Sequence, residues 1–174
     1  MVSPWEIFLF TKVASTLTLI VCLLLLFLFL IRTKSTQKAI SLLVTSAGLF
    51  FTVTVTKDYY HIARPIDSLV EASGYAFPSG HAAGIVFLAM VVSFLSCRLT
   101  TTYRYMIWAT CILTASVISY SRIILHVHTW FQVLVGICFG TFFGFLFIYL
   151  SNHKKLPAVW ADVRTFITGT HLRN

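Results

Sequence analysis

Carboxylate side chains are scarce in this sequence. The 174 residues include five Asp and Glu residues, and charged residues make up 10% of the chain, against about 25% in a typical soluble domain. The five carboxylates are not clustered, so a hydrolytic site built on two metal ions is not expected. Four cysteines lie inside apolar segments without a Cys-x-x-Cys spacing. We interpret them as small hydrophobic residues rather than as disulfides or metal ligands.

Hydrophobic residues, in contrast, are abundant. They make up 58% of the chain, which includes 16 Phe residues, and this composition is typical of an integral membrane protein. A hydrocarbon core of about 30 Å requires about 20 apolar residues per helix. We therefore predict one all-α domain over residues 1–174, a membrane helix bundle with about five transmembrane helices. The predicted spans are residues 13–31, 39–56, 82–97, 105–120 and 130–150.

The third and fourth spans are short, and we expect their ends to lie in polar surroundings within the protein. Residues 4–11 could add an interfacial turn before the first span. That first span could instead be a secretory signal peptide, but a retained helix fits better. Glu6 and Lys12 precede it, its apolar stretch exceeds the roughly 7–15 residues of a signal peptide, and no small-residue cleavage site follows.

Basic residues determine the expected orientation. The net charge is +8, and nine of the 13 Lys and Arg residues lie between the first and second helices, between the third and fourth, and after the fifth. Such an excess is typical of cytoplasmic loops, which places the N-terminus outside. The same explanation makes a nucleic-acid partner unnecessary. The nine residues are Arg32, Lys34, Lys38, Arg98, Arg104, Lys154, Lys155, Arg164 and Arg173.

Two further patterns concern packing. Gly136, Gly140 and Gly144 recur every four residues and would let another helix approach closely, although glycine is also simply common in membrane helices. Residues 153–174 carry apolar side chains at helical spacing, with Pro157 near the start. This predicts an amphipathic helix on the cytoplasmic surface. Its apolar residues are Leu156, Val159, Trp160, Val163, Phe166 and Ile167.

Three short segments gather cations and histidines at the ends of apolar runs, where charge is costly. Charge counting, which is independent of these segments, puts all of them on the membrane face opposite the basic loops. Arginine can hold two phosphate oxygens through parallel hydrogen bonds, and a helix N-terminus offers free N–H groups to an anion. The segments therefore predict a phosphate pocket. They are Lys57-x6-Arg64-Pro65, Pro78-Ser79-Gly80-His81 and Ser121-Arg122-x5-His128.

Each residue alone also has an ordinary structural interpretation. Lys57 and Arg64 could extend toward lipid headgroups or form ion pairs, and His81 or His128 could be a hydrogen-bonded interfacial histidine. Only the combined pattern favours the phosphate pocket. The carboxylates near enough for ion pairs are Asp58, Asp67 and Glu71.

Together, the three segments resemble the signature of the type-2 phosphatidic acid phosphatase superfamily, K-x6-RP, PSGH and SR-x5-H-x3-D. Ten of the eleven signature positions match in order, and the resemblance covers residues 57–132. It implies a membrane enzyme that hydrolyses the phosphate headgroup of a lipid without a metal or other cofactor. The bilayer and the lipid substrate are the implied partners, and no obligatory protein partner is expected.

The resemblance also implies residue roles. His128 corresponds to the nucleophile, which forms a phosphohistidine, and His81 to the group that protonates the departing lipid oxygen and then activates water. A neutral imidazole suits either role near physiological pH. Fixed cations best stabilise developing charge where water is partly excluded. The implied phosphate-binding residues are Lys57, Arg64, Ser79, Gly80 and Arg122.

One position departs from the signature, because Gln132 replaces the Asp that orients the nucleophilic imidazole. A Gln carbonyl can still accept the Nδ1–H bond, but it brings no negative charge; Asp58 or Asp67 could supply that charge from elsewhere. The His128-Thr129-Trp130-Phe131-Gln132 segment is similar to the His-Thr-Trp-x-Gln of dolichyl diphosphate phosphatases. This similarity favours an active enzyme and a polyprenyl diphosphate substrate.

Other interpretations remain open at the level of sequence. The same intermediate would serve a lipid phosphotransferase, and Gln132 could mark a lipid-phosphate binding protein with impaired catalysis. His126 and His128 could form a metal pair with His61 or a loop carboxylate as the third ligand. We prefer a role for His126 in supporting the site residues from behind or in contacting a lipid headgroup. The expected location is a bacterial inner membrane with the site facing the exterior, or the lumenal face in a eukaryote.

Overall fold

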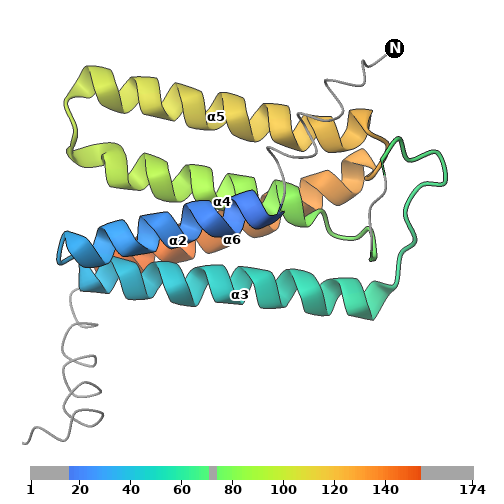
Figure 1. Ribbon diagram of the computed structural model, residues 1–174, viewed down its shortest axis with the longest axis horizontal. Coiled ribbons are helices and arrows are strands. Elements are labelled where there is room, and N and C mark those ends of the chain that lie inside the picture. The colour runs from blue at the N-terminus through green and yellow to red at the C-terminus, as the bar shows by residue number, and fades with distance from the viewer. Residues whose placement is uncertain (1–15, 71–73, 154–174) are drawn as a thin grey trace, which may run out of the picture.

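The computed structural model describes residues 16–70 and 74–153, and in these residues the chain is helical, without strands. Figure 1 shows the helices running side by side in a bundle. A short 3-10 helix, Ser96–Arg98, extends the end of α4. The α-helices are α2 Thr16–Arg32, α3 Thr36–Tyr60, α4 Gly80–Leu95, α5 Thr101–Ile124 and α6 Trp130–Asn152.

The predicted all-α membrane bundle is confirmed. Four of the described helical segments are long and apolar enough to cross a membrane, and α2 is a shorter apolar helix of 17 residues. The prediction that the fourth span is short is wrong, since α5 has 24 residues. The interfacial turn over residues 4–11 and the amphipathic helix over 153–174 lie outside the described residues, apart from His153, the C-cap of α6.

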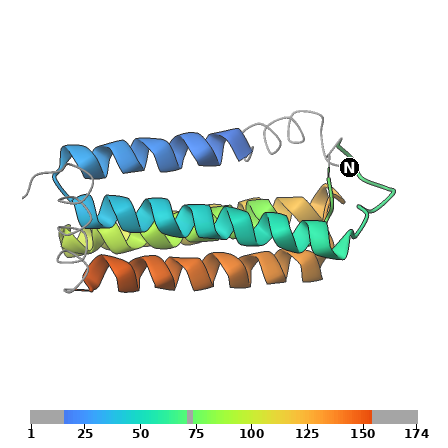
Figure 2. The same ribbon diagram turned by 90° about the horizontal axis from the view of Figure 1, so that it is seen from below.

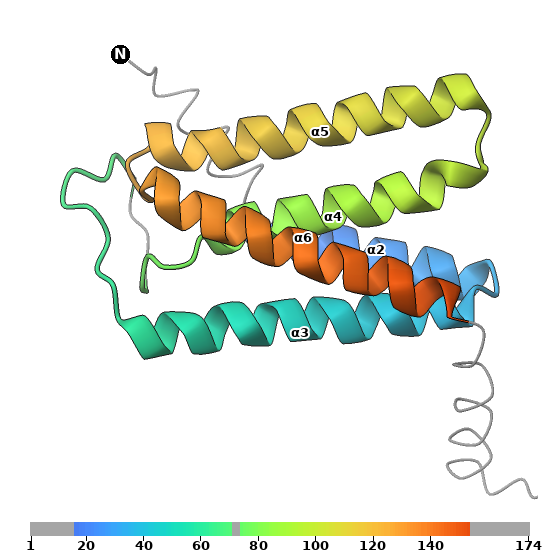
Figure 3. The same cartoon turned by 180° about the vertical axis from the view of Figure 1, so that it is seen from behind.

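Helix α4 is the centre of the bundle and packs mainly against α6 and α5. The glycine pattern explains the close approach of α6, as predicted. An added Cβ at Gly136 would lie 2.4 Å from the carbonyl oxygen of Ser79, and one at Gly140 would lie 2.3 Å from that of Ala83. Figure 3 shows α6 crossing between α3 and α5 on this side of α4.

Helix α2 covers the other side, so that α3 and α4 lie between α2 and α6 (Figure 2). The apolar core lies among these helices. Its largest fully buried side chains include Phe87 on α4, Phe147 on α6 and Leu42 on α3. Because Leu23, Leu26 and Phe27 of α2 also pack against this core, α2 is attached mainly through its second half.

The three motif segments meet at one end of the bundle. Helices α3 and α5 end there and α4 and α6 begin there, whereas the turns from α2 to α3 and from α4 to α5 lie at the opposite end (Figure 1). Those turns carry Arg32, Lys34, Arg98 and Arg104. The structure therefore separates the basic loops from the motif segments, as the sequence predicted.

We expect Gly140→Ala to destabilise the protein by about 1–3 kcal/mol, because the new methyl group would push against the rigid backbone of α4. Thermal or denaturant unfolding of the detergent-solubilised protein measures this loss. Gly84→Ala is the matched control, since its methyl group would meet only the flexible end of Leu19, at 2.9 Å. Equal stabilities of the two variants would show that α4 and α6 do not depend on this close contact.

Candidate phosphate-binding site

Backbone carbonyls of the connection between α3 and α4 hold two of the predicted cations. Lys57, in the last turn of α3, donates a hydrogen bond from Nζ to the carbonyl oxygen of Tyr75. Arg64 donates from Nε to the carbonyl of Gly74 at 3.1 Å, and from Nη1 to the carbonyl of Val127 at 3.2 Å. Arg64 therefore joins this connection to the one between α5 and α6.

The α5–α6 connection places His128 at the centre of the site. The backbone N–H of His128 donates to the carbonyl oxygen of Arg122 at 3.2 Å, which folds the chain back just after α5 ends. The His128 side chain is only 4% exposed. Nη1 of Arg64 lies 3.4 Å from its Nε2 atom.

Gln132 determines which nitrogen of His128 carries the proton. Its Oε1 atom lies 3.1 Å from the backbone N–H of Thr129, a donor, and 3.2 Å from Nδ1 of His128. The Oε1 atom carries no hydrogen, so it accepts from the Thr129 N–H and can only accept from Nδ1 of His128 as well. Nδ1 therefore carries the proton. The Nε2 lone pair then points toward Arg64 and the cavity.

The same glutamine starts helix α6. Thr129 is the N-cap, its Oγ1 accepts from the backbone N–H of Gln132 at 3.4 Å, and the two residues form a capping box. The carbonyl of Gln132 also accepts from the backbone N–H of Ser79 at 3.1 Å. Gln132 thus links the nucleophile candidate, the α6 N-terminus and the segment that begins α4.

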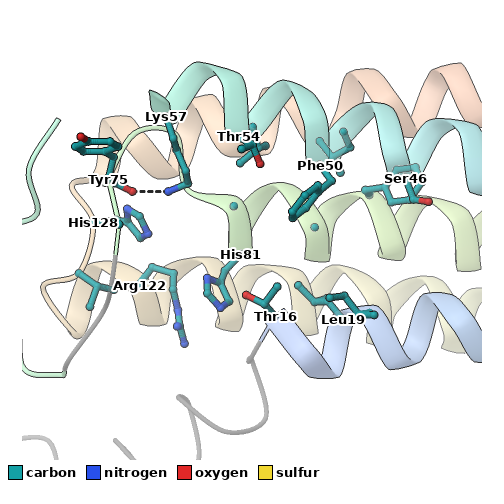
Figure 4. A pocket seen from close by; sticks show the side chains of 18 of the residues that line it. Thr16, Leu19, Ser46, Phe50, Thr54, Lys57, Tyr75, His81, Arg122 and His128 are labelled. Carbon is teal, nitrogen blue, oxygen red and sulfur yellow. Dashed lines mark hydrogen bonds between the residues drawn. The ribbon is translucent and has the colours of Figure 1, made fainter. Parts of the chain in front are cut away.

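His81 and Arg122 complete the group from two other helices. His81 is the second residue of α4, and Arg122 lies in the last turn of α5. Nε and Nη2 of Arg122 donate hydrogen bonds to Oγ of Ser121 at 3.2 and 3.1 Å, and these bonds fix the orientation of the guanidinium. Arg122 is only 4% exposed. Figure 4 shows the four side chains at one end of the pocket, with His128 between Lys57 and Arg122 and with His81 beside Arg122.

These side chains line one cavity of about 530 Å³. Its polar end is cationic, and no carboxylate is among the described residues that line it. Such a site attracts an anion strongly because the surrounding protein excludes much of the water. The predicted residues that line the cavity are Lys57, Arg64, Gly80, His81, Arg122 and His128. Hydroxyl-bearing residues that were not predicted also line it, namely Thr16, Ser46, Thr54 and Tyr75.

Ser79 does not line this cavity. It is fully buried at the N-cap of α4, and its Oγ has no hydrogen-bond partner within the described part of the chain. Its predicted contact with phosphate stays a prediction. Gly80 does line the cavity, but a Cβ there would make only ordinary contact with Val53, at 3.5 Å. This segment can therefore bind an anion through the free N–H groups of the α4 N-terminus. It does not depend on the absence of a side chain at Gly80.

Burial lowers the pKa of His128 to about 4, and the positive charge of Arg64 acts in the same direction. Burial also lowers the pKa of Arg64, although a guanidinium remains charged at any physiological pH. His128 is therefore neutral at pH 7. A neutral imidazole with a lone pair on Nε2, facing a cationic cavity, has the form required of a nucleophile toward phosphorus.

His126 lies outside this group. Its Nδ1 bonds to Oδ2 of Asp67 at the protein surface, and this hydrogen bond holds the pKa of Asp67 below its usual range. The carboxylate of Asp67 is therefore paired with His126, and it makes no hydrogen bond to His128. Among residues 16–70 and 74–153 no three His, Cys, Asp or Glu side chains are close enough to hold a metal ion together. The pairing of His126 with His128 and His61 is thus not assembled.

Sequence reasoning missed the contacts that hold these side chains in place. Thr129 carries a detectable signal, because Thr-x-x-Gln is the pattern of a capping box. The carbonyls of Gly74, Tyr75 and Val127 carry none, since any residue type supplies a carbonyl oxygen.

Comparisons with known proteins found a matching family and a similar fold. A sequence model of the PAP2 superfamily matches residues 38–156. The crystal structure of a transmembrane PAP2-type phosphatidylglycerolphosphate phosphatase from Bacillus subtilis has a similar fold, with a TM-score of 0.75. The two chains are 22% identical, and the match covers 84% of this chain and 77% of the other. No curated protein sequence matches.

Proposed function

This chain belongs to the PAP2 superfamily, and from that membership we propose that it is an integral membrane phosphatase acting on a lipid phosphate or diphosphate. The observation that carries the proposal is the state of His128. Gln132 fixes the proton on Nδ1, and the Nε2 lone pair faces a cavity whose polar end is cationic. A phosphorus atom bound among those cations would lie within reach of Nε2.

In the proposed reaction, Lys57, Arg64 and Arg122 bind the non-bridging phosphate oxygens and neutralise their charge. Nε2 of His128 attacks phosphorus, an N–P bond forms, and the bond from phosphorus to the leaving oxygen breaks. His81 donates a proton to that oxygen. The negative charge of the bound substrate favours the protonated imidazole that this step requires.

The second half of the reaction releases phosphate. His81, now neutral, takes a proton from water, and the water oxygen attacks phosphorus as the N–P bond breaks. His128 regains its starting form because Gln132 holds the Nδ1 proton throughout. No step uses a metal ion, and the proposed enzyme is metal-independent.

Among lipid phosphates we favour a polyprenyl diphosphate. The support is the His-Thr-Trp-x-Gln segment, in which Gln132 accepts the Nδ1–H bond and caps α6 at once. An aspartate is thus not required for orientation. We place the protein in a bacterial inner membrane. The excess of Lys and Arg at the other end of the bundle supports an orientation in which the cavity opens toward the periplasm or exterior.

A phosphate-release panel of lipid monophosphates and diphosphates tests the proposal. Purified protein is expected to release phosphate most rapidly from a polyprenyl diphosphate, at the same rate with and without EDTA. Loss of activity in EDTA that added metal restores would contradict metal independence. Transfer of the phosphate to another lipid would identify a phosphotransferase, and binding without turnover would identify a binding protein.

A further inference from the structure

The cavity continues beyond the cations into an apolar arm. This arm runs between α2, α3 and α4. Figure 4 shows Phe50 and Leu19 on opposite sides of it, to the right of Lys57 and His81. Its wall includes Leu19 and Leu23 from α2, Leu49 and Phe50 from α3, and Gly84 and Phe87 from α4. One continuous space therefore joins a place for an anion to a place for hydrocarbon.

The arm has a defined depth. It follows α3 from Lys57 to Ser46, a rise of about 16 Å at 1.5 Å per residue, roughly half of a hydrocarbon core of about 30 Å. Leu49 and Phe87 belong to the buried core, which also contains Leu42 and lies beyond the deep end. The arm thus has about the length of one bilayer leaflet.

Its capacity fits one chain. A cavity of about 150 Å³ holds one benzene ring, so the whole cavity of about 530 Å³ has room for roughly 20 non-hydrogen atoms. A diphosphate headgroup takes almost half of them, which leaves about a dozen carbons. The depth gives the same answer, because an extended chain advances roughly 1.3 Å per carbon for C–C bonds of about 1.5 Å.

We propose that this arm holds a single hydrocarbon chain, over about its first dozen carbons, and that the protein therefore selects single-chain lipid phosphates over diacyl lipids. The inference rests on the proposed function, in that the chain belongs to the substrate whose phosphate binds at the cations. Carbons beyond the arm add nothing to recognition. A second acyl chain has no place within the cavity.

Gly84 keeps the arm open. A Cβ at this position would already lie 2.9 Å from Cδ1 of Leu19 on the facing helix, so a leucine side chain there would fill the arm. Gly84 lies one turn beyond His81, and the cations belong to other segments. Ser46 lies at the deep end, where a larger side chain would shorten the arm.

The test uses a series of n-alkyl phosphates, lengthened two carbons at a time and kept below the concentration at which they aggregate. For the wild type, kcat/KM is expected to rise by up to about fourfold per methylene, the full value for transfer from water, and to level off near a dozen carbons. Gly84→Leu should abolish the rise while hydrolysing the shortest member at the wild-type rate. Ser46→Phe should bring the plateau forward by several carbons.

Val55→Phe is the matched control, because Val55 follows Thr54 on α3 but is 48% exposed on the outer surface; its profile should equal that of the wild type. The same series is also measured as binding to His128→Ala. This variant should bind with the same chain-length dependence as the wild type. Chain-dependent binding by the wild type without any phosphate release would defeat the proposed function and leave the arm standing. A rise that persists in both Gly84→Leu and Ser46→Phe would overturn the inference. Equal use of a diacylglycerol phosphate and a monoalkyl phosphate, which are both phosphate monoesters, would overturn it as well.

Discussion

Replacing His128 with alanine is expected to reduce phosphate release from a lipid diphosphate by about 10⁴-fold or more, with residual activity from the cations alone. The reason is geometric. His128 presents Nε2 to the cavity, and its Nδ1 is already committed to Gln132. Initial rates of phosphate release, measured at saturating substrate, give the size of the loss.

The control for this variant is binding. His128→Ala leaves Lys57, Arg64 and Arg122 in place, so it should bind an alkyl phosphate nearly as well as the wild type and unfold at nearly the same temperature. Activity within tenfold of the wild type in a well-folded variant would eliminate His128 as the nucleophile.

Gln132 is expected to control both the rate and its dependence on pH. Gln132→Leu removes the acceptor that orients the imidazole, and a loss of about 10²–10⁴ is expected, the upper value matching an orienting carboxylate elsewhere. Gln132→Glu keeps the length and the capping box but adds a negative charge beside Nδ1. That charge stabilises the imidazolium and raises the pKa of His128.

The sign of the pH effect follows from the requirement for a neutral nucleophile. With the pKa of His128 near 4, protonation of this residue limits the wild-type kcat/KM only in strongly acidic solution. The acid limb of the profile, which is the fall of kcat/KM at low pH, should move to higher pH in Gln132→Glu. The pH profile of kcat/KM for both proteins, measured with the same substrate, shows the shift.

Thr129→Ala separates capping from catalysis. It removes the hydroxyl that caps α6, at a cost of about 1 kcal/mol, but its backbone N–H still donates to Gln132. The expected result is lower stability with an unchanged acid limb. If Gln132→Glu also left the acid limb unchanged, the hydrogen bond between Gln132 and His128 would have no influence on the rate.

Much of the bundle could be predicted because the information is local. Apolar runs of membrane length give the helices, and the four-residue spacing of Gly136, Gly140 and Gly144 indicates the α4–α6 contact. The length of α5 was misjudged because a span predicted from hydropathy ends at the first charged residue. The helix itself continues past Arg104. Arg104 packs over the rings of Tyr105 and Trp108, at 5.3 and 5.6 Å, so the helix continues past the charge.

The candidate site was also predictable only in part. The types of its side chains were predictable because phosphate chemistry demands particular residues, and the structure brings His81, Arg122 and His128 together from three segments. The return of the α3–α4 connection over the site was not predictable. It depends on long-range bonds, such as that from Leu69 N–H to the Leu125 carbonyl and that between Asp67 and His126, which no local pattern marks.

In the proposed reaction, His128 carries the phosphoryl group during turnover. Rapid quenching of the enzyme with a lipid diphosphate labelled in its terminal phosphate detects this intermediate. We expect an acid-labile label on the peptide that contains His128, formed and lost as fast as phosphate is released, and absent from His128→Ala. Turnover at the full rate without labelled protein, or a label on another residue, would contradict it.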